Sequence, residues 1–220
     1  MHNITLIFTH HSELGNHTAQ ALCNVIHSIN PDVIFEELPE EYQVIAYNCK
    51  ASFGVEVDAI KMYLQHKTIA HIPVDTYGDL TASYFDTIND LNKGVASLGE
   101  FDQSKVRKLV IRKHKNLISQ HGLSFLNSDE NEELIRQEQR LQDEIVELSN
   151  DDILKQLNRK FKEDIHNREY EIIDNVYRYS ESNKYEQAIL FIGSGHRSTI
   201  ISVIEQFEAK ERLQLNWWLW

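Results

Sequence analysis

The sequence predicts an α/β fold in which a mostly parallel central sheet is flanked by helices. A strand, a helix and a second strand follow one another within residues 4–38, which is the pattern of a βαβ unit with a right-handed crossover. A second short apolar run, residues 188–192, ends in a glycine-rich turn and leads into another helix. Between these regions, residues 86–182 lack proline and repeat Leu and Ile at helical spacing. Because crossover helices join parallel strands, we expect the sheet to be parallel.

Residues that begin or end helices and strands mark the boundaries of the first βαβ unit. Residues 4–9 are largely apolar and β-branched, as in a buried strand. Thr18 is a candidate N-cap for an amphipathic helix at 18–29, and Pro31 prevents that helix from continuing. Residues 32–38 then predict a second short strand, which ends in acidic residues.

The next stretch predicts two helical segments and a third strand. Pro39 opens the first helical segment, and a better helix is expected at 54–65, where the apolar residues share one face. The third strand is expected at 68–75, and Pro73 near its end either weakens the ladder there or marks an edge. Residues 77–79, Tyr-Gly-Asp, are typical of a turn.

Residues 86–160 are predicted to be a helical-hairpin insertion within a single α/β domain that spans residues 1–220. The insertion is rich in Glu, Lys, Gln and Leu, and residues 122–129 are expected to connect two of its helices. The locally basic segment 105–115 is interpreted as a solvated helix face rather than a site for polyanions.

The C-terminal part is expected to return to the sheet. Asn167 is predicted to begin a helix, and a further helix is expected at 198–210 after the strand at 188–192. The last strand, residues 213–220, carries all three tryptophans. We expect these side chains to be buried against the chain's own helices or against a second copy, so this strand is a candidate surface for homo-oligomers.

Composition limits the classes of partner. The net charge of −12 opposes nucleic-acid binding, which depends on clustered Lys and Arg. The N-terminus lacks the features of a signal peptide, and no apolar run approaches the ~20 residues of a membrane helix. The chain is therefore expected in the cytoplasm, without a membrane or nucleic-acid partner. Its two cysteines do not indicate a disulfide framework.

Polar side chains collect at the carboxyl ends of the predicted strands, which is where α/β sheets bind ligands. The set comprises His10, His11, Glu36, Glu37, Asp75 and His196. Because side chains alternate along a strand, one histidine of the first pair and one glutamate of the second are expected to face a given pocket. Two imidazoles with one or two carboxylates are a normal ligand set for a divalent transition metal, which can generate a hydroxide nucleophile.

Five short motifs contain most of these residues. They are Phe8-Thr9-His10-His11, Pro31-Asp-Val-Ile-Phe-Glu-Glu37-Leu38, Val74-Asp75, Asn167-Arg168-Glu169 and Gly193-Ser-Gly-His196. In order and spacing, over residues 4–75 and 160–205, they resemble the TraB/PrgY–Tiki superfamily, which is related in fold to erythromycin-esterase-like and ChaN-like proteins. One position departs from the superfamily's pattern, since Phe8 stands where a glycine is expected.

The resemblance implies a divalent metal ion bound by His11, Glu37 and His196, with His10 as the alternative to His11. It implies a metal-dependent hydrolase that acts on a peptide or amide bond, or secondly on an ester, in a peptide or small-molecule substrate. Glu37 would be a metal ligand or the general base.

Asp75 and Arg168 match supporting positions of the same superfamily. An arginine there would orient a carboxylate or stabilise a developing oxyanion. The alternative for Arg168 is a structural salt bridge with Glu37 or Asp75.

Two further classes of function are compatible with the sequence. A non-catalytic module would bind a peptide, a small ligand or haem in the same pocket, with the helical insertion as a lid or partner surface; Phe8 in place of glycine motivates this alternative. An oligomeric regulator would use the tryptophan-rich strand as its interface. Ser194 is a poor candidate for an acyl nucleophile because its flanking glycines lack the spacing of a nucleophile elbow, whereas the same turn could bind an anion.

Overall fold

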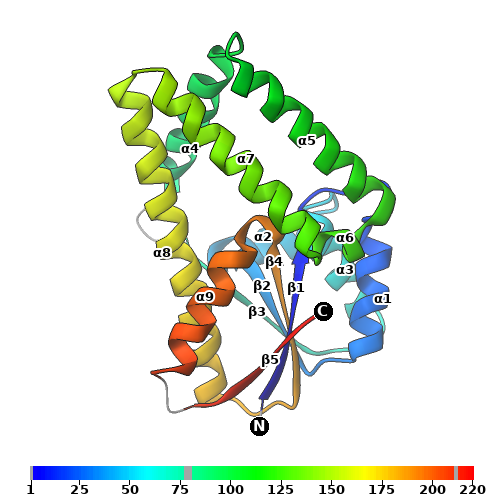
Figure 1. Cartoon of the computed structure of the whole chain (residues 1–220). Coiled ribbons are helices and arrows are strands. Elements are labelled where there is room, and N and C mark those ends of the chain that lie inside the picture. Colours follow the sequence, from blue (N-terminus) through cyan, green and yellow to red (C-terminus); the bar gives the residue numbers. More distant parts are fainter. Residues whose placement is uncertain (1, 77–80, 211–212) are drawn as a thin grey trace.

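The computed structural model describes residues 2–76, 81–210 and 213–220, and in these ranges it contains a five-stranded sheet with the order β3-β2-β4-β1-β5 (Figure 1). The strands are β1 (His2–Thr9), β2 (Val33–Pro39), β3 (Ala70–Asp75), β4 (Gln187–Gly193) and β5 (Leu215–Leu219). All four neighbouring pairs are parallel. The predicted α/β class with a parallel sheet is confirmed, and Pro73 lies on the edge strand β3.

Helices cover both faces of this sheet (Figure 1). Their bounds are α1 (Ala19–Ile29), α2 (Glu40–Asn48), α3 (Val55–Leu64), α4 (Thr81–Ser97), α5 (Asp102–His121), α6 (Leu123–Leu126), α7 (Asp129–Leu148), α8 (Asp152–Ser182), η2 (Ser194–His196) and α9 (Arg197–Glu208). On one face, buried residues of α8 and α9 such as Val176 and Val203 pack on β1 and β4. On the other face, α1 and α3 contribute Leu22 and Ile60. Burial of this apolar surface from both sides is what stabilises a parallel sheet.

A layer of helices, α4, α5, α7 and the first half of α8, extends beyond the carboxyl edge of the sheet (Figure 1). Leu91, Ile145 and Leu154 form a small core that joins α4, α7 and α8. At their opposite ends, α5 and α7 contribute Ile118 and Leu134 to the same core as α1 and α3. The layer is thus packed on the sheet as well as on itself.

Several expected boundaries differ from the structure. The helix expected to begin at Asn167 is the second half of α8, which starts at Asp152 and runs through residue 160 without a break because no glycine or proline interrupts its apolar stripe. Residues 122–129 contain the short helix α6 rather than only a connection. The turn expected at 77–79 lies outside the described residues. The division of the chain at residues 86 and 160 stays a prediction. In the described ranges, no helix is long and apolar enough to cross a membrane.

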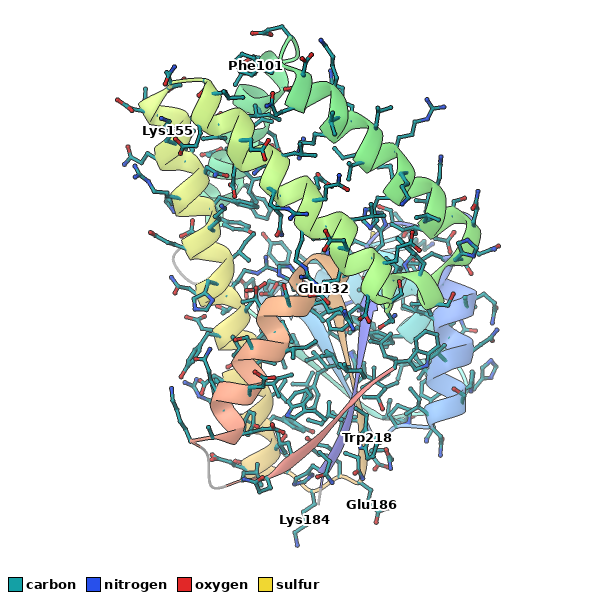
Figure 2. All side chains as sticks on the ribbon, in the orientation of Figure 1. Phe101, Glu132, Lys155, Lys184, Glu186 and Trp218 are labelled. Atoms are coloured by element: carbon teal, nitrogen blue, oxygen red, sulfur yellow. The ribbon has the colours of Figure 1, made fainter. Side chains whose placement is uncertain are left out.

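The tryptophan-rich strand is less buried than expected. β5 lies at the edge of the sheet beside β1. Trp217 packs partly against the core under α8 and α9, whereas Trp218 and Trp220 are exposed. Figure 2 shows Trp218 on β5. Alternation along an edge strand explains the difference, because α8 and α9 cover only one face of it. Self-association through this edge stays a prediction.

Candidate active site

The carboxyl ends of β2, β4 and β1 meet at one edge of the sheet, as neighbouring parallel strands must. β1 and β4 remain in register as far as Thr9 opposite Gly193. His11 follows β1 by two residues, Glu37 lies near the end of β2, and His196 ends the turn of 3-10 helix after β4. The fold therefore places these three predicted residues at one edge of the sheet.

Glu37 lies at the centre of this group. Its Oε2 accepts a hydrogen bond from the backbone N–H of Gly193 (2.6 Å), and its Oε1 accepts one from Nη2 of Arg168 (2.9 Å). Nε2 of His196 lies 3.4 Å from the same Oε1. Burial by itself would raise the pKa of Glu37, but the charge and hydrogen bond of His196, together with His11 and Arg168, lower it to about 2. Glu37 is therefore ionised at neutral pH and suits a ligand or a base, not an acid.

The ring of His196 is held between two carboxylates. Its Nδ1 lies 2.6 Å from Oε1 of Glu169, while its Nε2 faces Glu37. Burial by itself would lower the pKa of His196, but the charge of Glu37 and the bond with Glu169 raise it to about 10. Oε2 of Glu169 is buried and has no hydrogen-bond partner among the described residues. Glu169 was not predicted as a site residue.

His11 also has a carboxylate at Nδ1. Its Nδ1 lies 3.1 Å from Oε1 of Glu56, and this oxygen also accepts a hydrogen bond from the Thr9 hydroxyl (2.5 Å). The hydrogen bond with Glu56 and the charge of that carboxylate raise the pKa of His11 to about 9, although 63% of the His11 side chain is exposed. Glu56 lies in the first turn of α3 and was not predicted as a site residue.

Both histidines and Glu37 converge on Gly193. A methyl group placed on Gly193 would lie 3.4 Å from Nε2 of His11, 3.4 Å from Oε2 of Glu37 and 3.5 Å from Cδ2 of His196. Because both atoms lie 3.4 Å from that methyl position, the distance between Nε2 of His11 and Oε2 of Glu37 cannot exceed twice 3.4 Å. Gly193 has φ of −56°, which any residue adopts, so what the glycine provides at this position is space between the three side chains.

Arg168 links Glu37 to Asp75. Its Nε and Nη2 each donate to one carboxylate oxygen of Asp75 at 2.8 Å, Nη2 also donates to Glu37, and Nη1 donates to the hydroxyl of Tyr84 (3.1 Å). The hydrogen bonds and charge of Asp75, despite burial, raise the pKa of Arg168, so it stays charged. The salt bridge considered as the alternative for Arg168 is present with both predicted partners. The same bonds hold Glu37 in place.

His10 does not join this group. β1 ends at Thr9, so strand alternation no longer decides the direction of the residues after it. Nδ1 of His10 lies 3.0 Å from the carbonyl oxygen of Ser12, and the His10 backbone bonds with Nε2 of the buried His17. Burial lowers the pKa of His17, as expected for a neutral structural histidine. Of the two adjacent histidines, His11 is the one that lies beside Glu37.

Glu36 points away from Glu37, as strand alternation predicts. Its Oε2 accepts a hydrogen bond from the Tyr47 hydroxyl (2.5 Å), and its Oε1 lies 2.8 Å from Nδ1 of His71. Burial is the main reason why the pKa of Tyr47 is raised, so the phenol stays protonated. Glu36 thus connects β2 with α2 and β3. Tyr47 of α2 is thus part of this cluster.

The helical layer is bonded to two of the strand ends that carry the site. The side-chain amide of Asn127 bonds the backbone of Phe8, accepting from its N–H (2.9 Å) and donating to its carbonyl oxygen (3.0 Å). Arg197, directly after His196, forms ion pairs with Asp129 and Glu132 of α7. Figure 2 shows Glu132 at the end of α7 nearest to α9.

A cavity of about 330 Å³ opens beside Glu37. Its polar lining includes His11, Glu36, Glu37, Glu56 and Arg168, so both adjacent glutamates reach it rather than only one, and its remaining lining is mostly apolar. His196 is not part of this lining, although its Nε2 lies 3.4 Å from Oε1 of Glu37. A substrate in this cavity would therefore contact Glu37 and His11 directly.

The donor atoms at this site fit a divalent ion in their chemistry. Nε2 of His196 faces Glu37, Nε2 of His11 lies beside Gly193 as Glu37 does, and each ring has a carboxylate at Nδ1, as metal-binding histidines usually have. Their present spacing is set by hydrogen bonds among the side chains. Within residues 2–76, 81–210 and 213–220, no three or more His, Cys, Asp and Glu side chains are already arranged as a metal site.

The partner residues Glu56, Glu169 and Tyr84 were missed because each comes from a different part of the chain. The one available signal was Glu169, which stands in the same short motif as Arg168.

Comparisons of the chain with protein-family models, with curated proteins and with solved structures found no significant match. The resemblance stated from the motifs therefore stays a prediction.

Proposed function

We propose that this protein is a metal-dependent hydrolase that cleaves a peptide or amide bond, with an ester as the second choice. One observation supports this most strongly: His11 and His196 each have a carboxylate at Nδ1, and both rings lie with Glu37 around Gly193. In a metal-bound site each carboxylate would hold its ring through Nδ1–H, and Nε2 would bind the ion after losing the proton that the neighbouring carboxylates favour. The motif resemblance points to the same three residues.

In this proposal His11, Glu37 and His196 bind the ion. When bound, a divalent ion would polarise the substrate carbonyl and lower the pKa of a water molecule. The low pKa of Glu37 keeps its carboxylate ionised, so that it can serve as a ligand or accept a proton from the attacking water.

The remaining polar residues act by positioning. Glu56 and Glu169 hold the two histidine rings. Arg168, itself held by Asp75 at two points, keeps one oxygen of Glu37 in a fixed place through its 2.9 Å hydrogen bond. Such support matters because a metal site tolerates little displacement of its ligands.

Metal analysis of paired glycine variants tests the site. A methyl group in Gly193→Ala lies between His11 and Glu37, whereas in Gly195→Ala it meets nothing within 4 Å. Untagged wild type and Gly195→Ala, equilibrated with zinc and dialysed, should retain about one equivalent by mass spectrometry. Gly193→Ala and His196→Ala should retain far less. Equal retention in both glycine variants, or none in the wild type, would contradict the proposed site.

Cleavage of a peptide mixture by the zinc-equilibrated wild type tests the reaction. Products that appear with the wild type and Gly195→Ala, but not with Gly193→Ala, support hydrolysis at this site. Mass spectrometry of the products would show which bond is cut and whether one water is added.

A non-catalytic ligand-binding module is the second candidate. The hydrogen bonds that already join Glu37, Arg168 and Asp75 favour it, because a purely structural ion-pair cluster would also make them. This candidate predicts that a peptide, a small ligand or haem binds in the cavity without turnover. An oligomeric regulator that uses the exposed edge at Trp218 would additionally sediment as a dimer.

A further inference from the structure

The cavity beside Glu37 has two chemically different sides. The polar groups already described lie on one side. The other side is formed by aromatic and aliphatic groups: Tyr42 from α2, Phe53 from the segment before α3, Phe85 from α4, and Leu38, Pro39 and Val57 from the flanking elements. We call Tyr42, Phe53 and Phe85 the aromatic wall. Three separate segments thus contribute one aromatic ring each to the same cavity.

We propose that the aromatic wall is a specificity pocket for an aromatic or large aliphatic side chain of the substrate, adjacent to the bond that is cleaved. This inference rests on the proposed function, because it takes Glu37 as the place of the reaction. Cavities of roughly 300–1,000 Å³ that combine apolar walls with a few polar groups are the usual form of small-ligand sites. The volume of about 330 Å³ is at the lower end, which suits one side chain with its adjoining amide.

The exposed surface of the aromatic wall supports the proposal that a ligand binds in this cavity. The side chains of Phe53 and Phe85 are 38% and 45% exposed, although both belong to the lining of one concave site. Burial of aromatic surface is a major source of binding free energy, and rings prefer edge-to-face or offset contacts that a substrate ring would supply. An apolar side chain in the cavity would cover both phenylalanines at once.

The charges on the polar side favour an apolar occupant over a cationic one. Each carboxylate of the lining already accepts hydrogen bonds from within the chain: Glu36 from Tyr47, Glu37 from Arg168, and Glu56 from Thr9. The guanidinium of Arg168 further supplies positive charge to the same cavity. A lysine or arginine side chain would therefore compete with existing partners, whereas an apolar side chain would not.

The helical layer acquires a role from this arrangement. Phe85 stands on α4, next to Tyr84, whose hydroxyl accepts a hydrogen bond from Arg168. The same helix therefore contributes to the apolar wall and to the support of Glu37. Variation in α4 would alter the preferred side chain without altering the strand ends.

Binding of blocked amino acids to the full chain tests the pocket independently of turnover. N-acetyl-phenylalaninamide, N-acetyl-lysinamide and N-acetyl-alaninamide serve as probes, and ligand-observed NMR gives their dissociation constants. We expect the phenylalanine probe to bind at least about tenfold more tightly than the other two, the scale of discrimination that apolar pockets achieve. Phe53→Ala should remove this preference, Phe53→Leu should restore part of it, and Trp218→Ala, an exposed aromatic of β5, should leave it unchanged.

The outcomes separate the pocket from the reaction. A phenylalanine preference that depends on Phe53, without any peptide cleavage, supports the pocket and contradicts the proposed hydrolase. Cleavage without a preference for apolar side chains beside the cut bond supports the hydrolase and overturns the pocket. Equal binding of all three probes, tighter binding of the lysine probe, or an unchanged preference in well-folded Phe53→Ala would each overturn the pocket.

Discussion

Nδ1 of His196, just after the end of β4, lies 2.6 Å from Oε1 of Glu169, whose side chain is buried while that of His196 is partly buried. Glu169 holds the ring from α8, so that Nε2 faces Glu37 on β2. The second oxygen of Glu169 has no hydrogen-bond partner among the described residues, although burying an unpaired carboxylate oxygen costs free energy. A carboxylate kept at such a cost is better explained by its action on His196 than by stability.

Glu169→Gln is expected to weaken zinc binding about 10- to 100-fold, as changes to the partners of metal-binding histidines commonly do. Isothermal titration calorimetry measures the change, and circular dichroism confirms that the variant is folded. Glu171→Gln, an exposed position on the same helix, is the matched control and should bind zinc as the wild type does. Equal affinities in both variants would mean that Glu169 does not act through His196.

Asp75→Asn is expected to reduce the free energy of unfolding by about 3–5 kcal/mol, the usual effect of removing one partner of a buried ion pair. Asp75 forms two hydrogen bonds with Arg168, and both side chains are buried. The measurement is urea unfolding followed by circular dichroism. Glu133→Gln removes an exposed ion pair with Arg140 and should cost less than about 1 kcal/mol. A similar small loss in both variants would refute a structural role for the Arg168 bridge.

Asn127→Ala is expected to destabilise the end of β1 by about 1–3 kcal/mol, because a buried donor and acceptor lose their partner. Phe8 lies in the part of β1 that follows its last residue paired with β5. There the side-chain amide of Asn127 bonds both the N–H and the carbonyl oxygen of Phe8. Asn127→Asp keeps the acceptor but loses the donor, so it should also be destabilising. Hydrogen exchange at the Phe8 amide reports the effect directly.

The control for this position is Asn183→Ala, since Asn183 donates only to an exposed carbonyl of its own helix, that of Tyr179. Its exchange pattern at Phe8 should match that of the wild type. Unchanged protection of Phe8 in Asn127→Ala would show that this amide contributes nothing to the strand end.

Much of the sheet could be predicted because its strands are short apolar runs with clear ends. Asn30-Pro31 ends α1, Thr18 caps it, and the edge position of β3 agrees with Pro73. The start of α8 was missed because the sequence around it has no clear boundary. Nothing between Asp152 and Ser182 marks a boundary, and an uninterrupted helical stripe should have been taken as one helix.

The candidate site could be predicted only in part. The rule that parallel strands present their carboxyl ends at one edge identified a wider set of candidates, and the motif resemblance selected His11, Glu37 and His196 from it. The carboxylates that hold the histidines could not be found in this way, because Glu56 and Glu169 reach the site from helices and sequence spacing does not encode such contacts. Alternation also failed to choose between the adjacent histidines, since the strand had already ended at Thr9.

The acid sensitivity of the fold is expected to depend on Asp32, which joins the start of β2 to that of β4. Its Oδ2 accepts hydrogen bonds from the backbone N–H groups of Glu186 (2.9 Å) and Gln187 (3.1 Å). These two bonds lower the pKa of Asp32 from its ordinary value of 3.8. A carboxyl group whose pKa is lower in the folded state contributes stability above its ordinary pKa, and this contribution is lost as the pH falls through the folded value.

The wild type should therefore be more stable than Asp32→Asn near neutral pH, and the difference should shrink as the pH falls below about 4. Urea unfolding at a series of pH values between 7 and 2 measures this difference. Asp90→Asn, an exposed position on α4 whose carboxylate lies 3.7 Å from Lys93, is the control. Since this pair is exposed and lies within one helix, its removal should change stability little at any pH. A difference between wild type and Asp32→Asn that stays constant down to pH 2 would show that the charge of Asp32 is not what stabilises the junction of β2 and β4.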